Sequence, residues 1–323
     1  MLIDFPLFKF LPMLRESIKV RANATVANVS CGFDCLGYAI SEPADIVRIS
    51  KKNSPGIKIS ISGKKADTIP LTPENNTAGK SMLSLLENLN IKQGFKVHID
   101  KGIHPGSGLG SSAASAVGAV YGANKLLNSP LETEELIEHC MVGEIVSSGT
   151  SHADNVAAAL LGGFILVRSY NPLDIIKLPV PKKLVSINVL PDYVLNTKEA
   201  RKILPKHLPL SSAIEQAGNI SGFIAGLYEE DLNLLGRSMV DLIGEPVRSI
   251  LIPGYESVHK SAMDLGAVGC GISGSGPSVF ALSDSIDKAN LIGHKMVKSF
   301  KNVGLESELF ISSIHKSSPQ ILD

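Results

Sequence analysis

A glycine-rich segment is the part of this sequence whose residue types most clearly suggest chemistry. It reads Pro-Gly-Ser-Gly-Leu-Gly-Ser-Ser-Ala over residues 105–113. Closely spaced glycines expose backbone N–H groups that no side chain covers, and such groups can bind a chain of phosphates. The small residues from Ser111 onward predict a helix, whose first turn would point free N–H groups and the positive end of its dipole at the same anion. The segment therefore predicts a phosphate-binding loop.

The spacing of this segment excludes two better-known nucleotide-binding loops. It has no Gly-Lys-Ser/Thr ending, which a Walker A loop requires, and its third glycine comes too early for the Rossmann pattern. The alternative interpretation is a flexible turn in front of a helix that Ser111 or Ser112 caps. The same two hydroxyl groups could instead contact a phosphate or a bound metal ion.

The composition is that of an ordinary globular protein. Of 323 residues, 44% are hydrophobic and 19% are charged. Lys+Arg and Asp+Glu number 31 each, so no strong net field attracts nucleic acid or an acidic membrane. No run approaches the ~18 apolar residues of a membrane span, and residues 1–14 lack the pattern of a secretory signal. We therefore expect a cytoplasmic protein with four reduced, mostly buried cysteines, starting at Met1 or at Met13.

The elements that must position the loop follow from hydrophobic periodicity. Phe95–Ile99 alternates and predicts a strand leading into the loop, and a helix over residues 111–127 leads out of it. Further strands are expected over residues 18–29, 45–50, 57–62, 164–168, 185–189, 267–272, 278–282 and 306–311. Further helices are expected over residues 77–89 with Thr77 as the cap, 132–147, 211–237, 255–265 and 286–300. A second glycine-rich loop, residues 271–277, joins two of these strands.

The order of these elements indicates the fold class. Strands that come in adjacent pairs as often as they alternate with helices favour an α+β fold with antiparallel sheets. The length suits two domains, and the proline-rich segment Leu178–Lys183 is the candidate hinge. We place the domains at residues 16–180 and 181–323.

Three segments, in order, resemble the conserved motifs of the GHMP kinases, the family of galacto-, homoserine, mevalonate and phosphomevalonate kinases. Residues 105–113 are similar to the second motif, Gly271–Ser278 to the third, and Ala22–Leu36 to the first. The resemblance spans most of the chain. It implies a kinase with a two-domain fold: an N-terminal, ATP-binding domain like the second domain of ribosomal protein S5, and a ferredoxin-like C-terminal domain. The active site would lie between them.

Further segments are similar to the homoserine kinase branch of this family, namely residues 151–157, 197–201 and 245–254. The likeness implies ATP-dependent phosphorylation of the hydroxyl group of L-homoserine, a step of threonine biosynthesis, with Mg²⁺ as a second cofactor. Mg²⁺ would be held by Ser112 and Glu144. The second glycine-rich loop would close over the first. ATP would contact Pro105, Gly106, Ser107, Gly108, Leu109, Gly110, Ser111, Ser112 and Ala113, with its adenine near Asn76.

The likeness also implies a site for a zwitterion. The ammonium group of homoserine needs a carboxylate, and its carboxylate suits the planar fork of arginine. Asp34 would bind the ammonium group and Arg201 and Arg248 the carboxylate, while Asn28 and His152 would line the pocket. Taken without the motifs, the two arginines would be interpreted as solvated helix residues.

The attacking hydroxyl group would be held by Asn155. Mevalonate kinases place a catalytic base in the region of Asp154, so two routes for the hydroxyl proton stay open. Asp154 accepts it, or it passes to the γ-phosphate itself, because phosphoryl transfer depends on positioning and charge neutralisation more than on a base.

Two other functions stay open at this point. A mevalonate or sugar kinase would not need the paired arginines, and a non-catalytic binding module would be expected to have lost the phosphate loop or Glu144. We expect no nucleic-acid or membrane partner, and the resemblance leaves a homodimer open. Neighbouring His139 and Cys140 would point to different sides of a helix, so we interpret them as structural rather than as a nucleophile and its base.

Overall fold

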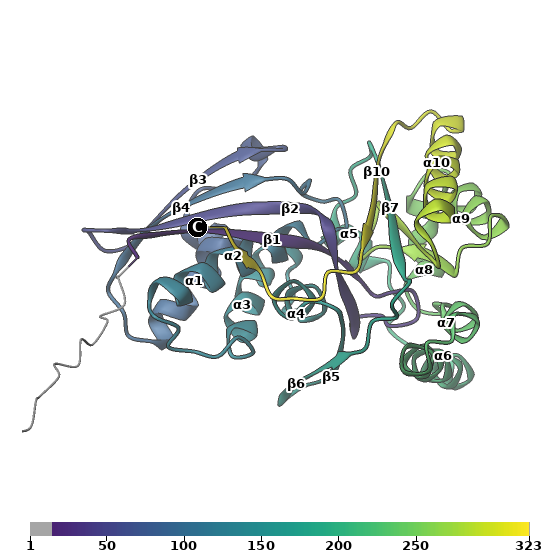
Figure 1. The fold of residues 1–323 in the computed structure, drawn as a ribbon, viewed down its shortest axis with the longest axis horizontal. Coiled ribbons are helices and arrows are strands. Elements are labelled where there is room, and N and C mark those ends of the chain that lie inside the picture. The colour runs from purple at the N-terminus through teal and green to yellow at the C-terminus, as the bar shows by residue number, and fades with distance from the viewer. Residues whose placement is uncertain (1–14, 323) are drawn as a thin grey trace, which may run out of the picture.

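The fold is taken from a computed structural model that describes residues 15–322, apart from the side chains at positions 148, 197 and 198. The choice between Met1 and Met13 as the first residue lies outside this range. Within it, the chain forms two sheets with separate sets of helices (Figure 1). Across the described residues, no helix combines the length and the apolar character that a membrane crossing needs.

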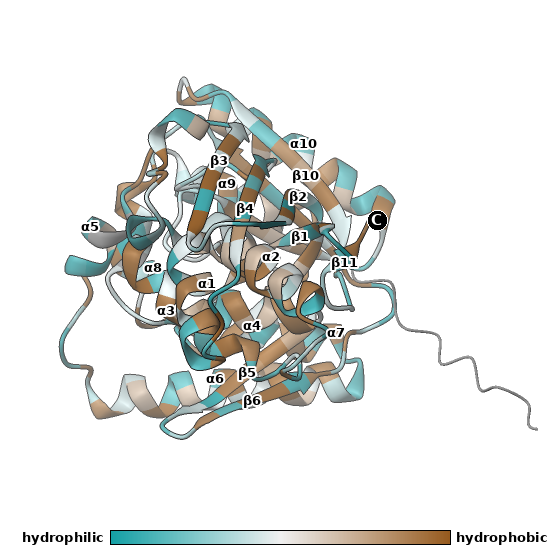
Figure 2. Ribbon diagram, turned by 90° about the vertical axis from the view of Figure 1, so that its left-hand side faces the viewer, coloured by the Kyte–Doolittle hydropathy of each residue, from teal (hydrophilic) through white to brown (hydrophobic). Residues whose placement is uncertain are grey.

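The first sheet is long and twisted, and it carries the phosphate loop. Its order is β11-β1-β2-β4-β3, with β5 and β6 continuing from β2. The pairs are antiparallel except for β3 with β4. In Figure 2, β3 and β4 alternate between brown and teal residues, as expected for strands with one covered face. The strands are β1 (Ser17–Ala27), β2 (Leu36–Lys52), β3 (Ile57–Gly63), β4 (Gly94–Lys101), β5 (Phe164–Tyr170), β6 (Leu173–Leu178) and β11 (Gln320–Ile321).

Four helices lie on one face of this sheet, three of them against the strands and α3 against α1 and α2 (Figure 1). They are α1 (Thr77–Asn88), α2 (Ser111–Leu126), α3 (Leu136–Ser148) and α4 (Asp154–Leu161). α2 lies close against the strands because its small residues face them. A Cβ atom on Gly118 would lie 2.6 Å from Cγ2 of Val47, and one on Gly122 would lie 2.3 Å from Cδ1 of Ile49. The small residues therefore set the depth at which the helix, and the loop before it, are seated.

The second sheet has the antiparallel order β10-β7-β9-β8. Its strands are β7 (Val185–Pro191), β8 (Gly269–Ile272), β9 (Val279–Ser283) and β10 (Ser307–Ser313). α9 (Tyr255–Asp264) and α10 (Ile286–Asn302) pack on it, and α6 (Leu210–Glu229) and α7 (Leu232–Ser238) form a separate pair. The short elements are α5 (Thr197–Lys202), α8 (Glu245–Arg248) and the 3₁₀ turns η1 (Ala66–Thr68), η2 (Pro73–Asn75) and η3 (Ser249–Leu251).

An aromatic cluster joins the two halves of the molecule. The ring of Tyr38 on β2 lies 4.8 Å from that of Phe164 and 6.1 Å from that of Phe280 on β9. The Tyr38 hydroxyl group also lies 2.9 Å from Oγ of Ser186 on β7, which satisfies its polar end in a fully buried place. The candidate hinge Leu178–Lys183 connects the two sheets between β6 and β7. The domain boundary at residue 180 stays a prediction.

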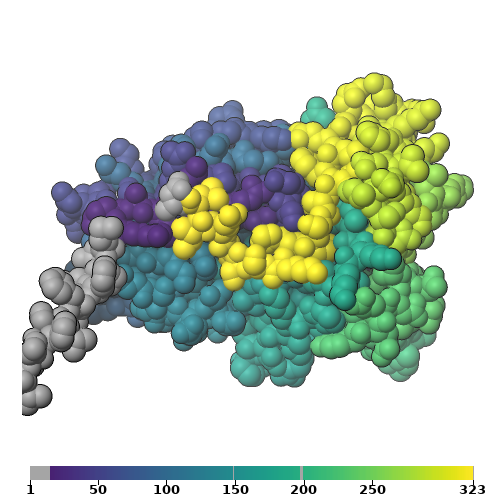
Figure 3. Space-filling model, in the orientation of Figure 1, coloured from purple at the N-terminus to yellow at the C-terminus, as the bar shows by residue number. Residues whose placement is uncertain are grey.

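The last described residues return to the first sheet. In Figures 1 and 3 the yellow segment after β10 runs back across the first half of the molecule. There β11 pairs with β1, with Val20 opposite Ile321. A strand of two residues is too short to show a hydrophobic periodicity, so the sequence did not predict this long-range pairing.

Three local details differ from those that the sequence suggested. The cap of α1 is Asn76 rather than Thr77, because its side chain accepts a bond from the Gly79 N–H at 3.2 Å. Of the two uses left open for the hydroxyl groups of Ser111 and Ser112, capping does not occur: the cap of α2 is Gly110, with no side-chain acceptor, and the two hydroxyl groups donate to the Ile103 carbonyl and to Glu144. The helix expected over residues 211–237 is two helices, broken where Glu230 adopts a left-handed conformation at φ 53°.

Candidate active site

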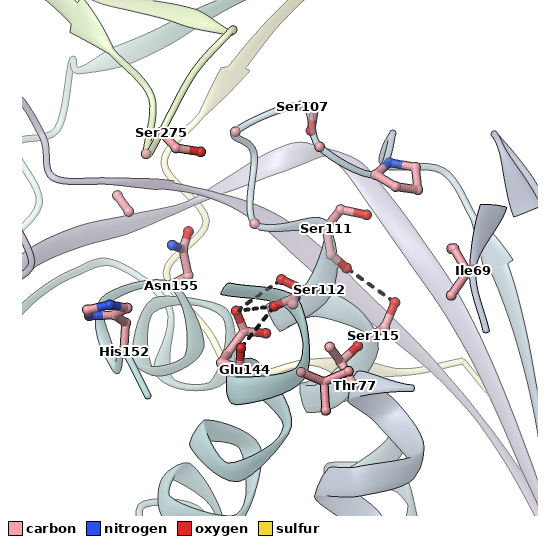
Figure 4. A pocket seen from close by; sticks show the side chains of 18 of the residues that line it. Ile69, Thr77, Ser107, Ser111, Ser112, Ser115, Glu144, His152, Asn155 and Ser275 are labelled. Carbon is pink, nitrogen blue, oxygen red and sulfur yellow. Dashed lines mark hydrogen bonds between the residues drawn. The ribbon is translucent and has the colours of Figure 1, made fainter. Parts of the chain in front are cut away.

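A cleft of about 320 Å³ lies between the two halves and is lined by residues of both. Figure 4 shows its side chains, with His152 and Asn155 on one side of Ser112 and Glu144, and Ile69 and Thr77 on the other. The cleft brings together most of the residues that the sequence predicted. Leu109 and Ala113 are exceptions, because both are buried and neither lines it.

The phosphate loop has the backbone that its glycines allow. Gly106, Gly108 and Gly110 have φ values of 71°, 81° and 65°, a region that residues with a Cβ atom rarely adopt. Gly110 directly precedes α2, so the free N–H groups of the helix's first turn lie at the cleft. The geometry is that of an anion-binding loop at a helix N-terminus.

The second glycine-rich loop packs directly on the first. Ser273 Oγ donates to the Gly108 carbonyl at 2.8 Å, and the Ser278 N–H donates to the Ser107 carbonyl at 3.2 Å. A Cβ atom at position 108 would lie 2.5 Å from the Ser273 carbonyl oxygen. Glycine is therefore needed at 108 for the approach of two backbones as well as for its φ value.

A buried ion pair under the loop was missed by sequence reasoning. Lys101 Nζ contacts the Asp45 carboxylate and donates to the Ser111 carbonyl and to Ser115 Oγ, both at 2.9 Å. Asp45 also accepts bonds from the N–H groups of Gly102 and Ile103 at 3.1 and 3.0 Å. Burial lowers the pKa of Lys101, and the Asp45 carboxylate opposes this shift. The pair joins β2, the end of β4 and the first turn of α2. In the sequence, Asp45 and Lys101 are single charged residues in separate strands, and no local pattern predicts that they form a pair.

Ser112 and Glu144 lie together as predicted, with Ser112 Oγ donating to Glu144 Oε2 at 3.0 Å. Burial raises the pKa of Glu144 to about 7, and the Ser112 bond opposes this shift. A hydroxyl and a carboxylate oxygen are the hard donors that Mg²⁺ takes, together with water and phosphate oxygens. The donor set fits the ion. Among the described residues, no group of three or more His, Cys, Asp and Glu side chains forms a metal-binding cluster.

The residues predicted for the zwitterion form a charged cluster. Arg201 Nη2 lies 2.5 Å from Asp34 Oδ2, and His152 Nδ1 lies 3.7 Å from Asp34 Oδ1. Arg248 is 4% exposed, and its guanidinium lies over the Phe33 ring at 5.2 Å. Burial lowers the pKa of His152, so the imidazole tends to be neutral beside the two arginines.

The main chain of Asp34 is held from both sides. Asp34 has φ 56°, and its N–H donates to Asn28 Oδ1 at 3.0 Å, while its carbonyl accepts a bond from Tyr170 Oη at 2.9 Å. Asn28 Nδ2 in turn donates to the Gly274 carbonyl at 2.8 Å, which Arg248 also contacts at 3.2 Å. Tyr170 was missed because it ends an ordinary strand. A tyrosine there has no motif to mark it.

Asn155 and Asp154 begin α4, and both line the cleft. Asn155 Oδ1 accepts a bond from Thr25 Oγ1 at 2.6 Å. Asp154 is 3% exposed, and its Oδ1 accepts the Asn155 N–H at 2.8 Å. Burial raises the pKa of Asp154 to about 7, and the nearby Asp34 carboxylate adds to the shift.

Asn76 lines the far end of the cleft beside apolar side chains of Ile61, Ile69 and Ile99. Its side chain caps α1 and donates to the Pro70 carbonyl at 2.7 Å, so it shapes this wall. The other group that the sequence considered lies away from the cleft. His139 Nδ1 is 2.9 Å from Ser84 Oγ, and Cys140 is buried, so the two do not act as a pair. All four cysteines are free thiols.

Comparison with known proteins agrees with this geometry. The description "GHMP kinases N terminal domain" matches residues 76–163, and "GHMP kinases C terminal" matches residues 223–302. Together with the relatives below, these matches show that the chain belongs to the GHMP kinase family, which carries the two-domain fold described above. The family uses ATP as a substrate.

Relatives that are similar over most of the chain are named homoserine kinase. One from Chlorobaculum tepidum is 44% identical over 93% of this chain and 97% of its own length. One from Methanococcus vannielii is 43% identical over 83% of this chain and 88% of its own length. The crystal structure of homoserine kinase from Cytophaga hutchinsonii superposes with a TM-score of 0.92 at 46% identity, covering 99% of this chain and 100% of the other. A mevalonate kinase of L. major, at 19% identity and a TM-score of 0.68, shares the fold.

Proposed function

We propose that this protein is a homoserine kinase, which transfers the γ-phosphoryl group of ATP to the hydroxyl group of L-homoserine and so serves threonine biosynthesis. The observation that carries the proposal is one cleft in which an anion-binding loop lies beside a carboxylate and two arginines. A sugar or mevalonate has no ammonium group for Asp34. The relatives named homoserine kinase support the same substrate.

The nucleotide would bind with its phosphates on the loop of residues 105–113 and its adenine near Asn76. Backbone N–H groups and the start of α2 bind the phosphates without a lysine side chain. Ser112 and Glu144 would hold Mg²⁺, which would neutralise charge on the phosphates as they react. The apolar side chains around Asn76 suit one face of a flat base.

Homoserine would bind at the ion pair that Asp34 and Arg201 already form. Its ammonium group would replace Arg201 as the partner of Asp34, and its carboxylate would take Arg201 and Arg248. Both charged groups of homoserine would thereby have a partner of opposite charge. A ligand with only one charged group would leave a half-buried charge of the protein without a partner. His152 and Asn28 complete this end of the cleft.

Asn155 would hold the hydroxyl group near the phosphates. We propose that the hydroxyl proton passes to an oxygen of the γ-phosphoryl group rather than to Asp154. The Asn155 N–H donates to Asp154 Oδ1, and phosphoryl transfer depends on positioning and charge neutralisation more than on a base.

The test is an assay of ADP release with a panel of hydroxyl compounds. Homoserine should be phosphorylated, and mevalonate, galactose and 4-hydroxybutyrate should not. The last compound has the carboxylate and the hydroxyl but lacks the ammonium group, so it isolates the contribution of Asp34. Phosphorylation of mevalonate and not of homoserine would refute the substrate, and binding of Mg-ATP without any turnover would indicate a non-catalytic member.

A further inference from the structure

The side chain of Thr25 reaches a residue of the cleft from behind. Thr25 is fully buried in β1, and its hydroxyl group donates to Asn155 Oδ1 at 2.6 Å. Asn155 lines the cleft, whereas Thr25 does not. The Thr25 hydroxyl group can therefore influence the reaction only through Asn155.

The third glycine of the phosphate loop leaves room for this bond. A Cβ atom on Gly110 would lie 1.9 Å from Thr25 Oγ1 and 3.0 Å from Asn155 Oδ1. The Thr25 N–H also donates to the Leu109 carbonyl at 3.1 Å, which ties the strand to the loop. β1, the loop and α4 therefore meet at this point, and Thr25 and Asn155 lie in contact where the three elements pack.

A carboxamide has an accepting oxygen and a donating NH₂ group, and its neighbours decide which of them faces a ligand. The Thr25 hydroxyl group occupies Oδ1 of Asn155. No hydrogen bond joins Asn155 Nδ2 to another side chain or carbonyl within the part of the chain that the structure describes. The NH₂ group is therefore the one available to a ligand in the cleft.

We infer that Thr25 is a positioning residue that turns the amide of Asn155 so that its NH₂ group donates to the reacting oxygens. The inference rests on the proposed function. In that reaction the homoserine hydroxyl oxygen bonds to the γ-phosphorus, the bond from that phosphorus to ADP breaks, and the hydroxyl proton passes to a γ-phosphoryl oxygen. A donor at Asn155 holds the attacking oxygen through one lone pair and leaves the other for attack.

The first test compares Thr25→Val with Thr25→Ser. Valine keeps the shape of the side chain and removes the hydroxyl group, so the Asn155 amide loses its partner. We expect kcat to fall about 10-fold, the loss of one orienting hydrogen bond, with KM for ATP changed by less than ~2-fold. Thr25→Ser should restore most of kcat. A Thr25→Val enzyme with wild-type kcat would overturn the inference.

A double variant separates this role from a general packing defect. If Thr25 acts through Asn155, adding Thr25→Val to Asn155→Ala should change kcat by less than ~2-fold, because the amide that Thr25 orients is already gone. A further 10-fold loss in the double variant would show that the threonine acts by another route.

Asn155→Asp tests the orientation directly and does not require any change at Thr25. The aspartate can still accept the Thr25 bond, but it places a carboxylate oxygen where the NH₂ group stood, facing the phosphates. We expect kcat below that of Asn155→Ala. Activity near wild type would mean that an acceptor faces the cleft and would overturn the inference. A wild-type enzyme that does not phosphorylate homoserine would instead refute the proposed function, and with it this role of Thr25.

Discussion

Replacing Gly108 by alanine should damage the active site far more than the same change at a matched position. Gly108 has φ 81°, and a Cβ atom there would lie 2.5 Å from the Ser273 carbonyl oxygen and 2.8 Å from that of Gly276. Gly56 has φ 89°, and a Cβ atom there would have no heavy atom within 4 Å. Both variants carry the conformational cost, but only Gly108→Ala also forces two backbones apart.

The magnitudes follow from these two terms. A left-handed alanine costs roughly 1–2 kcal/mol, which should be the whole effect of Gly56→Ala. Relief of the contact at position 108 needs a shift of about 0.5–1 Å in a close-packed interface, which adds roughly 1–3 kcal/mol. We therefore expect Gly108→Ala to lose ~2–5 kcal/mol of stability. A misplacement of this size at a reacting centre also costs about 100-fold in rate, so kcat/KM for ATP should fall by that order.

The assays are urea unfolding and steady-state kinetics with ATP varied, on wild type and both variants. Equal losses of stability in the two variants would refute the close approach of the two glycine-rich loops. A Gly108→Ala enzyme that is less stable but has unchanged kcat/KM for ATP would refute the role of this loop in holding the nucleotide.

Three further results are expected. Asp154→Asn should remove a pH dependence of stability. The pKa of Asp154 in the folded protein, about 7, lies above its ordinary value of 3.8. The carboxyl group therefore contributes fully to stability below pH 3.8 and loses this contribution as the pH rises to 7. Between pH 5 and 8, the free energy of unfolding of the asparagine variant should therefore rise relative to that of wild type by at least ~1 kcal/mol, as measured by urea unfolding. The kcat of this variant should stay within ~10-fold of wild type, and a loss of kcat beyond ~1,000-fold would instead make Asp154 a base. Tyr170→Phe should raise KM for homoserine about 3- to 10-fold with KM for ATP unchanged, because the Asp34 carbonyl and the Ala153 N–H beside His152 both lose their bond to the Tyr170 hydroxyl group, and equal effects on both substrates would contradict this. Glu144→Gln should raise the Mg²⁺ concentration needed for half-maximal rate at least ~10-fold, and an unchanged Mg²⁺ titration would remove Glu144 as a ligand.

The sequence predicted the parts of this molecule that local pattern determines. The glycines of the phosphate loop, the small-residue helix behind it and the strand before it were found at nearly their observed bounds, because φ preferences and periodicity act over a few residues. The GHMP motifs then identified the charged cluster around Asp34.

What local pattern does not encode is which distant residues meet. Thr25 and Asn155 are 130 positions apart, and Asp45 and Lys101 are 56 apart, so neither pair leaves a trace in any window of sequence. The caps were missed for a related reason. Ser112 can cap a helix in isolation, but in the fold its hydroxyl group is taken by Glu144, and tertiary context overrides the local preference.

The return of the chain's last strand to the first sheet has a consequence for synthesis on the ribosome. The Leu322 N–H donates to the Lys19 carbonyl, the His315 N–H to the Ala39 carbonyl, and the Gly163 N–H to the His315 carbonyl. When the N-terminal half emerges from the ribosome, the edge of its sheet at β1 would stay unpaired until some 150 further residues, including β11, had been translated. At about 5–20 residues per second this is a delay of roughly 7–30 s, during which the open edge of β1 would be exposed to other nascent chains.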